Sequence, residues 1–335
     1  MAAVGPSTPV TALQRPRAPE APAPLVVVLS SSAPFHLCVQ RELGRARCVR
    51  RVSSDAWEPT DLAVDGWVVR VEPRVCSVGG ARIVEAPHDG LAGGEIRAPF
   101  QLADVAPLTL GVTCGRSAEG QVACDSFEAP GAFRPVLEGG APVVADAIAT
   151  TGHTLLALEG SGRLLCVGRQ CELLEAQLRG ADREDLPEPD GSLASGSAWP
   201  VGPDLPEATT IADAITRVRT DGLGATCVED RRHRVVCHGG RYFPTVEADV
   251  AGALDYAMAG NDLCVLRGPV ESARLACRYH DRDGATTEVL TAEVPGAHRL
   301  HASGTTLCVE TDATLACTEL RGTTPAAPLS DVPLG

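Results

Sequence analysis

The chain has few aromatic side chains and lacks any long run of apolar residues. Phe, Trp and Tyr together make up 3% of its 335 residues, so few ring faces are available for stacking on a carbohydrate. The longest strongly apolar run, Leu25–Leu29, is far shorter than the roughly 18 residues of a membrane-spanning helix. It is also shorter than the apolar core of about 7–15 residues in a secretory signal. We therefore predict no membrane span and no clear signal peptide.

The chain also lacks an excess of basic residues. It contains 29 Lys and Arg against 43 Asp and Glu, which gives a formal net charge of −14. Binding to nucleic acid requires a cationic surface that neutralises phosphates, so we predict no nucleic-acid partner. At 44% hydrophobic and 21% charged residues, the composition is that of a folded globular protein.

Motifs for catalysis and for metal binding are missing as well. The sequence contains no Gly-x-Ser-x-Gly, no phosphate-binding Walker loop and no His-Glu-x-x-His. Cys171 has Gln170 and Glu172 as neighbours and no local group that would activate a thiol. Cys166-x4-Cys171 has no second closely spaced pair to complete a zinc site, and Asp281–Gly284 lacks the downstream glutamate of a calcium loop. We predict no enzyme activity, no metal and no cofactor.

What the chain does have is a repeat, together with 34 glycines, 26 prolines and 13 cysteines. The first marker of each unit falls at Cys38, Cys76, Cys114, Leu156, Cys227, Cys264 and Cys308. Leu156 belongs to the series because Gly152–Leu156 aligns with Gly260–Cys264 and Gly304–Cys308. Steps between markers are 37 to 44 residues except for one of 71, which indicates one large insertion. Four short apolar or alternating runs per unit of about 40 residues are typical of a β-propeller.

The count predicts an all-β fold: a seven-bladed β-propeller with four-stranded antiparallel blades, closed by an N-terminal strand. The whole chain, 1–335, forms one domain, with a closing segment at 1–24, blades over about 25–330 and a loop insertion at about 172–207. Pro9–Leu13 matches the fourth strand that the last unit lacks, and sharing it would hide a sheet edge. The tail Pro328–Val332 is an alternative source of that strand.

Three stretches carry a family resemblance: Gly152 to Gly168, Gly224 to Gly239 and Gly304 to Cys317. Gly-x-x-x-Cys, a turn and then Gly-x-Leu-x-Cys-x-Gly resembles the regulator of chromosome condensation repeat, particularly its cysteine-rich bacterial form. The Trp-Gly that often follows the second cysteine in that family is absent here. The resemblance implies a seven-bladed propeller. Family members include a nucleotide-exchange factor and secreted β-lactamase inhibitors, but none of their functional motifs is found in this chain.

A second cysteine follows the first by nine to thirteen residues in five units. In an antiparallel hairpin whose turn lies midway, such cysteines are opposite each other and close enough for a disulfide. Reduced cysteines filling the space between blades are the open alternative. The candidate pairs are Cys38 and Cys48, Cys114 and Cys124, Cys227 and Cys237, Cys264 and Cys277, and Cys308 and Cys317. Cys76, Cys166 and Cys171 are predicted to be unpaired.

Two features suggest a binding surface. Arg231, Arg232 and Arg234 lie at a predicted hairpin tip of an otherwise acidic chain, where they could attract an acidic partner. Trp199 lies in the polar insertion and has the side chain most often found as an interface anchor. Solvated turn residues and a tryptophan folded onto a blade are the plainer alternatives.

Taken together, these features predict a non-enzymatic protein–protein interaction module or scaffold, monomeric, with an unidentified protein partner. The alternatives are a hydrolase or lyase with its site at the central channel, and a secreted carbohydrate-binding or adhesive module. The cysteine pairs favour an extracytoplasmic address, whereas the lack of a clear signal peptide argues against it, so the compartment stays open.

Overall fold

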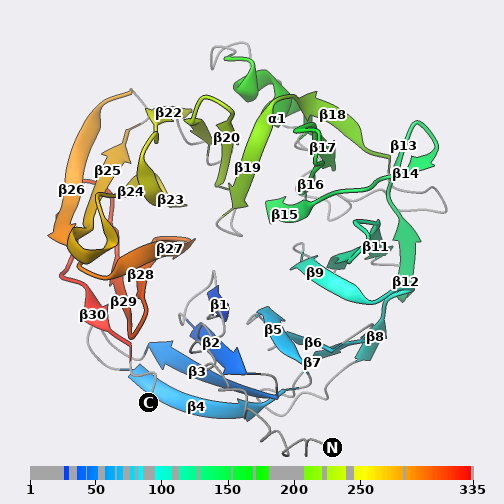
Figure 1. The fold of residues 1–335 in the computed structure, drawn as a ribbon, viewed down its shortest axis with the longest axis horizontal. Helices are drawn as coiled ribbons and strands as arrows, with labels where there is room; N and C mark the ends of the chain where they lie inside the picture. Colours follow the sequence, from blue (N-terminus) through cyan, green and yellow to red (C-terminus); the bar gives the residue numbers. More distant parts are fainter. Residues whose placement is uncertain are drawn as a thin grey trace, which may run out of the picture.

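The computed structural model describes residues 26–29, 36–42, 44–51, 57–64, 66–70, 76–79, 82–85, 95–107, 113–126, 129–151, 154–168, 171–180, 207–220, 225–238, 245–281 and 284–332. These residues form four-stranded antiparallel sheets that stand around a common centre as the blades of a propeller (Figure 1). The all-β prediction and the predicted propeller arrangement are therefore confirmed.

Within each sheet the strands follow one another in chain order from the centre of the ring outward. The first sheets are β1 (Val26–Leu29), β2 (His36–Glu42), β3 (Arg45–Arg51) and β4 (Trp57–Ala63), then β5 (Trp67–Arg70), β6 (Cys76–Gly79), β7 (Arg82–Glu85) and β8 (Glu95–Arg97), then β9 (Leu102–Pro107), β10 (Thr113–Ser117), β11 (Val122–Ser126) and β12 (Ala129–Pro135). A two-stranded hairpin of β13 (Leu137–Glu138) and β14 (Ala141–Pro142) follows.

The remaining sheets have the same order. They are β15 (Ala147–Thr151), β16 (Thr154–Leu158), β17 (Leu164–Val167) and β18 (Thr209–Ala212), then β19 (Ile215–Thr220), β20 (Thr226–Asp230), β21 (Arg234–His238) and β22 (Val246–Asp249), then β23 (Ala253–Ala259), β24 (Asp262–Arg267), β25 (Arg274–His280) and β26 (Thr286–Glu293), then β27 (Ala297–Ser303), β28 (Thr306–Thr311), β29 (Leu315–Glu319) and β30 (Ser330–Asp331). A 3-10 turn, Val270–Ser272, lies between β24 and β25.

The ring closes between the first and last sheets through side-chain packing. Leu37 and Val49 of the first sheet are fully buried against Leu315 and Cys317 of the last. The innermost strands β1 and β27 also contact each other. Burying an apolar face of each sheet against its neighbour removes both faces from water, which is why a ring of half-apolar sheets is stable.

The fourth strand of the last sheet comes from the C-terminal tail. β30 pairs with β29, with Ser330 opposite Cys317 and Asp331 opposite Ala316. This strand belongs to the tail segment 328–332 that the sequence offers as the alternative source. The predicted N-terminal strand, residues 9–13, lies outside the described residues, as does the whole closing segment 1–24.

The turn between the second and third strands of a blade fixes how the next blade begins. The carbonyls of Gly120 and Gly162 accept hydrogen bonds from the backbone N–H groups of Ala145 and Ile215, at 2.8 and 2.9 Å. Both glycines have left-handed φ angles, +88° and +91°, and a Cβ there would lie only 2.8 and 3.0 Å from a backbone oxygen. At Gly120 and Gly162 a side chain would be too close to the neighbouring chain segment, so glycine is needed in these two turns.

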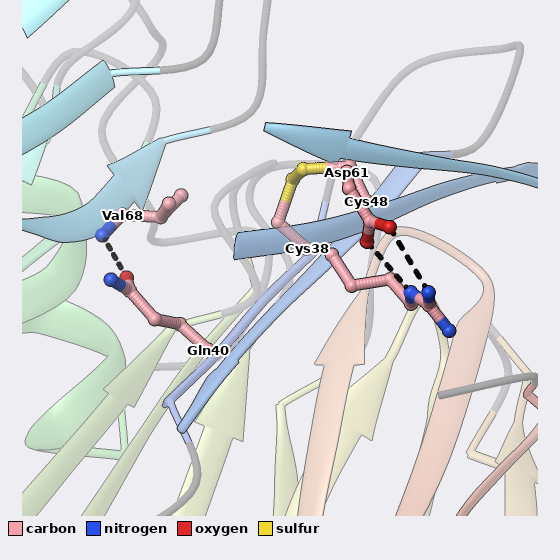
Figure 2. The surroundings of a disulfide bond; sticks show 6 residues. Cys38, Gln40, Cys48, Asp61 and Val68 are labelled. Carbon is pink, nitrogen blue, oxygen red and sulfur yellow. Dashed lines mark hydrogen bonds and ion pairs between the residues drawn. A yellow bond between two sulfur atoms is a disulfide. The ribbon is translucent and has the colours of Figure 1, made fainter. Parts of the chain in front are cut away.

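A buried glutamine joins the first sheet to the second. Gln40 on β2 accepts a hydrogen bond from the N–H of Val68 on β5 at 2.7 Å (Figure 2). It also donates one to the carbonyl of Gly66 at 2.6 Å. Its side chain is 1% exposed. The amide therefore satisfies two backbone groups at the start of the second sheet that would otherwise be buried without partners.

The insertion begins with a helix, so the prediction of a loop over 172–207 is wrong at that end. α1 (Cys171–Leu178) packs against β18, with Leu173 and Leu174 buried. The segment is made of strong helix formers and ends at Gly180, whose φ of +77° is that of a helix C-cap. Residues 181–206, with Trp199 among them, lie outside the described residues.

Candidate functional site

The five predicted cysteine pairs are joined as disulfides. In each, the two cysteines are directly opposite in the register of the second and third strands, and their Cα atoms are 4.0 to 4.1 Å apart. The bonds are Cys38–Cys48, Cys114–Cys124, Cys227–Cys237, Cys264–Cys277 and Cys308–Cys317. Figure 2 shows the first of them, across β2 and β3. All ten cysteines are at most 8% exposed, so these bonds stabilise hairpins and offer no reactive surface.

Cys166 and Cys171 were predicted to be unpaired, and that prediction is wrong: they form a sixth disulfide. The residue opposite Cys166 in the hairpin is Leu156, so its sulfur has no cysteine across the strand pair. Cys171 instead supplies the partner from the first turn of α1. The bond attaches the helix to the outer part of the sheet formed by β15–β18. Cys76 lies opposite Glu85 in β7 and so has no cysteine facing it.

Charged side chains buried near the centre of the ring form contacts between the inner strands of neighbouring sheets. Asp255 on β23 is 2% exposed and lies 2.6 Å from Arg219 and 3.2 Å from Arg217, both on β19. It also accepts a hydrogen bond from the N–H of Leu300 on β27, at 2.8 Å. Both guanidiniums lie over the ring of Tyr256, at 5.6 and 5.4 Å from its centre. These contacts join three successive sheets, and we therefore assign these residues a structural role.

A second buried pair lies on the last sheet. His301 Nε2 is 2.6 Å from a carboxylate oxygen of Glu310, and both side chains are largely buried. Burial lowers the pKa of His301, although the hydrogen bond to Glu310 acts in the opposite direction. Within the described ranges, no three His, Cys, Asp or Glu side chains are grouped to hold a metal ion.

The arginines predicted to bind a partner lie around a pocket of about 560 Å³. It opens between helix α1, strand β18 and the sheet of β19–β22, and the β20–β21 turn forms part of its rim. Its floor is apolar, and buried core residues form it: Ile211, Ile215, Val228 and Val236, with the partly buried Leu178. Its rim is charged, with Arg179, Arg231, Arg232, Arg234, Glu175, Asp213 and Asp230.

The tip that holds the arginines is a defined turn. A carboxylate oxygen of Asp230 accepts hydrogen bonds from the N–H groups of Arg232 and Arg234, at 2.8 and 3.0 Å. His233 has a φ of +60°, at the position where glycine stands in the β10–β11 and β16–β17 turns. Its carbonyl accepts the N–H of Val250 at 2.9 Å, as Gly120 and Gly162 do for their neighbouring sheets. The two hydrogen bonds to Asp230 fix the backbone of this turn, so the side chains of the tip project from defined positions.

Asp230 is held in its ionised form at this tip. Burial alone would raise its pKa, but the N–H groups of Arg234 and Arg232 and the charge of Arg234 outweigh that effect, and the pKa is lowered. The Arg234 guanidinium lies 3.5 Å from Asp230 and 3.7 Å from Glu247. The charges of Arg234 and Asp230 are therefore largely satisfied within the protein.

The other two tip arginines are different. Arg231 donates to the carbonyl of Ser161 at 2.9 Å, a neutral acceptor, and Arg232 has no side-chain partner within the described part of the chain. Both are exposed, and neither forms an ion pair with a described carboxylate. Arg179, across the pocket on α1, is paired with Glu175. Arg231 and Arg232 thus supply cationic groups at the rim that remain available to a ligand.

The arginine pocket was only partly foreseen from sequence. The sequence identifies the tip. It misses the α1 side of the pocket, with Arg179 and Leu178, because it predicts a loop over 172–207 where the structure begins with a helix. The helix formers from Cys171 to Leu178 and the glycine at 180 are the signal in the sequence that indicates this helix.

No helix of the described chain has the length and apolar character needed to cross a membrane.

Comparisons with known proteins leave the family open. No protein-family model and no curated protein matches this sequence. Three solved structures have similar folds: human WBSCR16 (TM-score 0.43, 10% identity, over 94% of this chain and 84% of that one), a chain of the mitotic checkpoint complex (0.48, 10%, over 92% and 96%), and dihydro-heme d1 dehydrogenase NirN in complex with DHE (0.47, 12%, over 96% and 66%). None of these similarities indicates what the protein does.

Proposed function

We propose that this protein is a non-enzymatic interaction module that binds another protein through the pocket between α1 and the β20–β21 turn. The observation that carries the proposal is the pair Arg231 and Arg232: two exposed arginines without an ion pair to any described carboxylate, on a preorganised turn above an apolar floor. Arginine at the edge of an apolar pocket is the composition of energetically important sites in protein interfaces.

The scaffold suits this role because its sheets are held by contacts among their own strands. Disulfides and buried inner-strand ion pairs hold the sheets, so turns can vary in sequence without loss of the core. We propose further that the ring has seven blades and belongs with the regulator of chromosome condensation-like proteins. Support comes from the recurrence of the cysteine hairpin and from the contacts of the last sheet with the first.

We also propose an extracytoplasmic address. Six disulfides are consistent with an oxidising compartment, where such bonds persist. The alternatives of a hydrolase or lyase at the central channel and of a carbohydrate-binding module stay predictions, since no particular contact among the described residues favours either.

Site-specific photocrosslinking tests the proposed function. The variant Asp213→p-benzoylphenylalanine places a crosslinker at the pocket rim and keeps both arginines, and the same replacement at Arg274 serves as the control. Arg274 lies on β25, in another sheet, with 73% of its side chain exposed. In an extract of the source cells, we expect a saturable crosslink to one protein from position 213 that unlabelled protein competes away. Identical products from positions 213 and 274 would contradict the proposal.

A further inference from the structure

We propose that the pocket binds an extended acidic peptide segment of the partner, whose carboxylates pair with Arg231 and Arg232 and whose large apolar side chain lies on the pocket floor. This inference rests on the proposed function and identifies the chemistry of the partner. It follows from the balance of charges at the rim, the nature of the floor and the charge of the rest of the molecule.

The charge balance favours an anionic ligand. Arg179 and Arg234 already have carboxylate partners, and Asp230 and Glu175 are used by them. Arg231 and Arg232 remain, against the single carboxylate of Asp213, which has no described cationic partner. A guanidinium donates two parallel hydrogen bonds to a carboxylate, so two adjacent arginines are suited to two acidic side chains or to one that bridges them.

The tip geometry makes such binding favourable. Arg231 is already oriented by its bond to Ser161, and the backbone of Arg232 is fixed by the carboxylate of Asp230. Less conformational entropy is therefore lost when a ligand orders these side chains than on a free loop.

The floor specifies an apolar anchor. Ile211, Ile215 and Val228 are between 2% and 8% exposed yet line the pocket. The pocket volume of about 560 Å³ holds more than one side chain, which matches a short stretch of peptide. A purely polyanionic ligand would make no favourable contact with these side chains or with the partly buried Leu178, so we expect the segment to combine acidic and apolar residues.

The acidic character of the whole chain restricts where such a segment can bind. With a net charge of −14, the chain as a whole repels an acidic peptide at long range, so two exposed arginines without a described ion pair form a favoured binding point. Like-charge repulsion elsewhere thereby contributes to specificity.

A peptide-display selection tests this inference. A library of random 12-residue peptides is selected on the full-length protein, and enriched peptides are synthesised with a fluorophore for anisotropy titration. We expect enrichment of sequences with several Asp or Glu and at least one large apolar residue, and weaker binding as salt rises from 50 to 300 mM.

Two double variants locate the binding. Arg231→Glu with Arg232→Glu should weaken the enriched peptides at least tenfold. Arg274→Glu with Arg321→Glu changes the charge equally on exposed side chains away from the pocket and should change affinity less than twofold. Unchanged thermal unfolding of both variants would show that they remain folded.

The contrary outcomes are distinct. Enriched peptides without acidic bias, or equal losses in both double variants, would overturn the inference. So would an enrichment that appears only after Asp182, Glu184, Asp185 and Glu188 are changed to amides, since the chain's own acidic stretch would then be the occupant. A specific crosslink from position 213 in any of these cases would leave the proposed function standing.

Discussion

The guanidinium of Arg219 on β19 lies 2.6 Å from the carboxylate of Asp255 on β23, and this ion pair joins two neighbouring sheets of the ring. The same guanidinium donates to the carbonyls of Tyr256 and Leu300, at 2.8 and 3.3 Å, so it also reaches β27. Removal of Asp255 would leave the largely buried guanidinium of Arg219 without its carboxylate partner.

We predict that Asp255→Ala lowers the free energy of unfolding by about 3–5 kcal/mol, because two arginines and the N–H of Leu300 lose their acceptor. Glu293→Ala, which breaks the exposed pair with Arg274, is the control and should have little effect. Urea unfolding followed by fluorescence measures both. Equal midpoints for the two variants would show that the Asp255 network contributes nothing beyond a surface pair.

Substitutions of Gln40 on β2 and of Arg47 on β3 should differ in the same way, one at a buried and one at an exposed contact. Gln40→Ala leaves the N–H of Val68 and the carbonyl of Gly66 unpaired, and we expect a loss of about 2–4 kcal/mol of stability. Arg47→Ala breaks only an exposed pair with Asp61 and should hardly change the unfolding midpoint. Hydrogen exchange at Val68 should rise in the Gln40 variant alone; exchange that stays slow there would refute the role given to this amide.

Asp262 should make stability depend on pH. Burial raises its pKa to about 7, and its Oδ1 atom has no hydrogen-bond partner. The native state therefore holds a proton that the unfolded chain releases near pH 4, so stability should fall as pH rises from about 4 to about 7. The expected loss is on the order of 2–4 kcal/mol.

Asp262→Asn cannot ionise and should remove most of this loss, which makes the variant more stable than the parent at pH 8. Asp312→Asn, at a side chain that is 91% exposed, is the control. The free energy of unfolding of the parent and of both variants, measured every half pH unit from pH 4 to 8, tests this prediction. A parent curve that rises through this window, or one that Asp262→Asn leaves unchanged, would contradict the prediction.

Alkylation of the unfolded, unreduced protein should modify one cysteine, Cys76, since the other twelve form disulfides. Mass spectrometry counts the added groups and locates them by digestion. Three modifications, at Cys76, Cys166 and Cys171, would support the pairing expected from the repeat instead, and thirteen would mean a reduced protein.

Cys171→Ser should release α1 from the sheet while the hairpin disulfides stay intact. We expect faster hydrogen exchange over residues 172–179 and at least threefold weaker binding of the acidic peptides, because one wall of the pocket is lost. Cys317→Ser with Cys308→Ser, which removes a disulfide on another sheet, should leave peptide affinity unchanged. If exchange in α1 stays slow in Cys171→Ser, packing against β18 alone holds the helix.

The repeat could be recognised from sequence because its signal is local. Cys227 and Cys237 are ten residues apart around a turn, and a hairpin brings such residues opposite each other whatever the rest of the chain does. The glycine before the returning strand follows from the same local geometry. The arginine tip was also visible, because Arg231 and Arg232 are neighbours in one turn.

The remaining features depend on contacts between distant segments. Cys166 pairs with Cys171 because Leu156 occupies the opposite position and α1 folds back onto β18. β29 finds its outer neighbour in β30, a choice between two proline-bearing termini that local pattern could not make. The pocket draws on two sheets and a helix. Sequence by itself determined the hairpins, because the interactions that form them lie between residues close together in the chain. Tertiary packing decided the sixth disulfide, the last strand and the pocket, because there segments far apart in the sequence compete for the same neighbours.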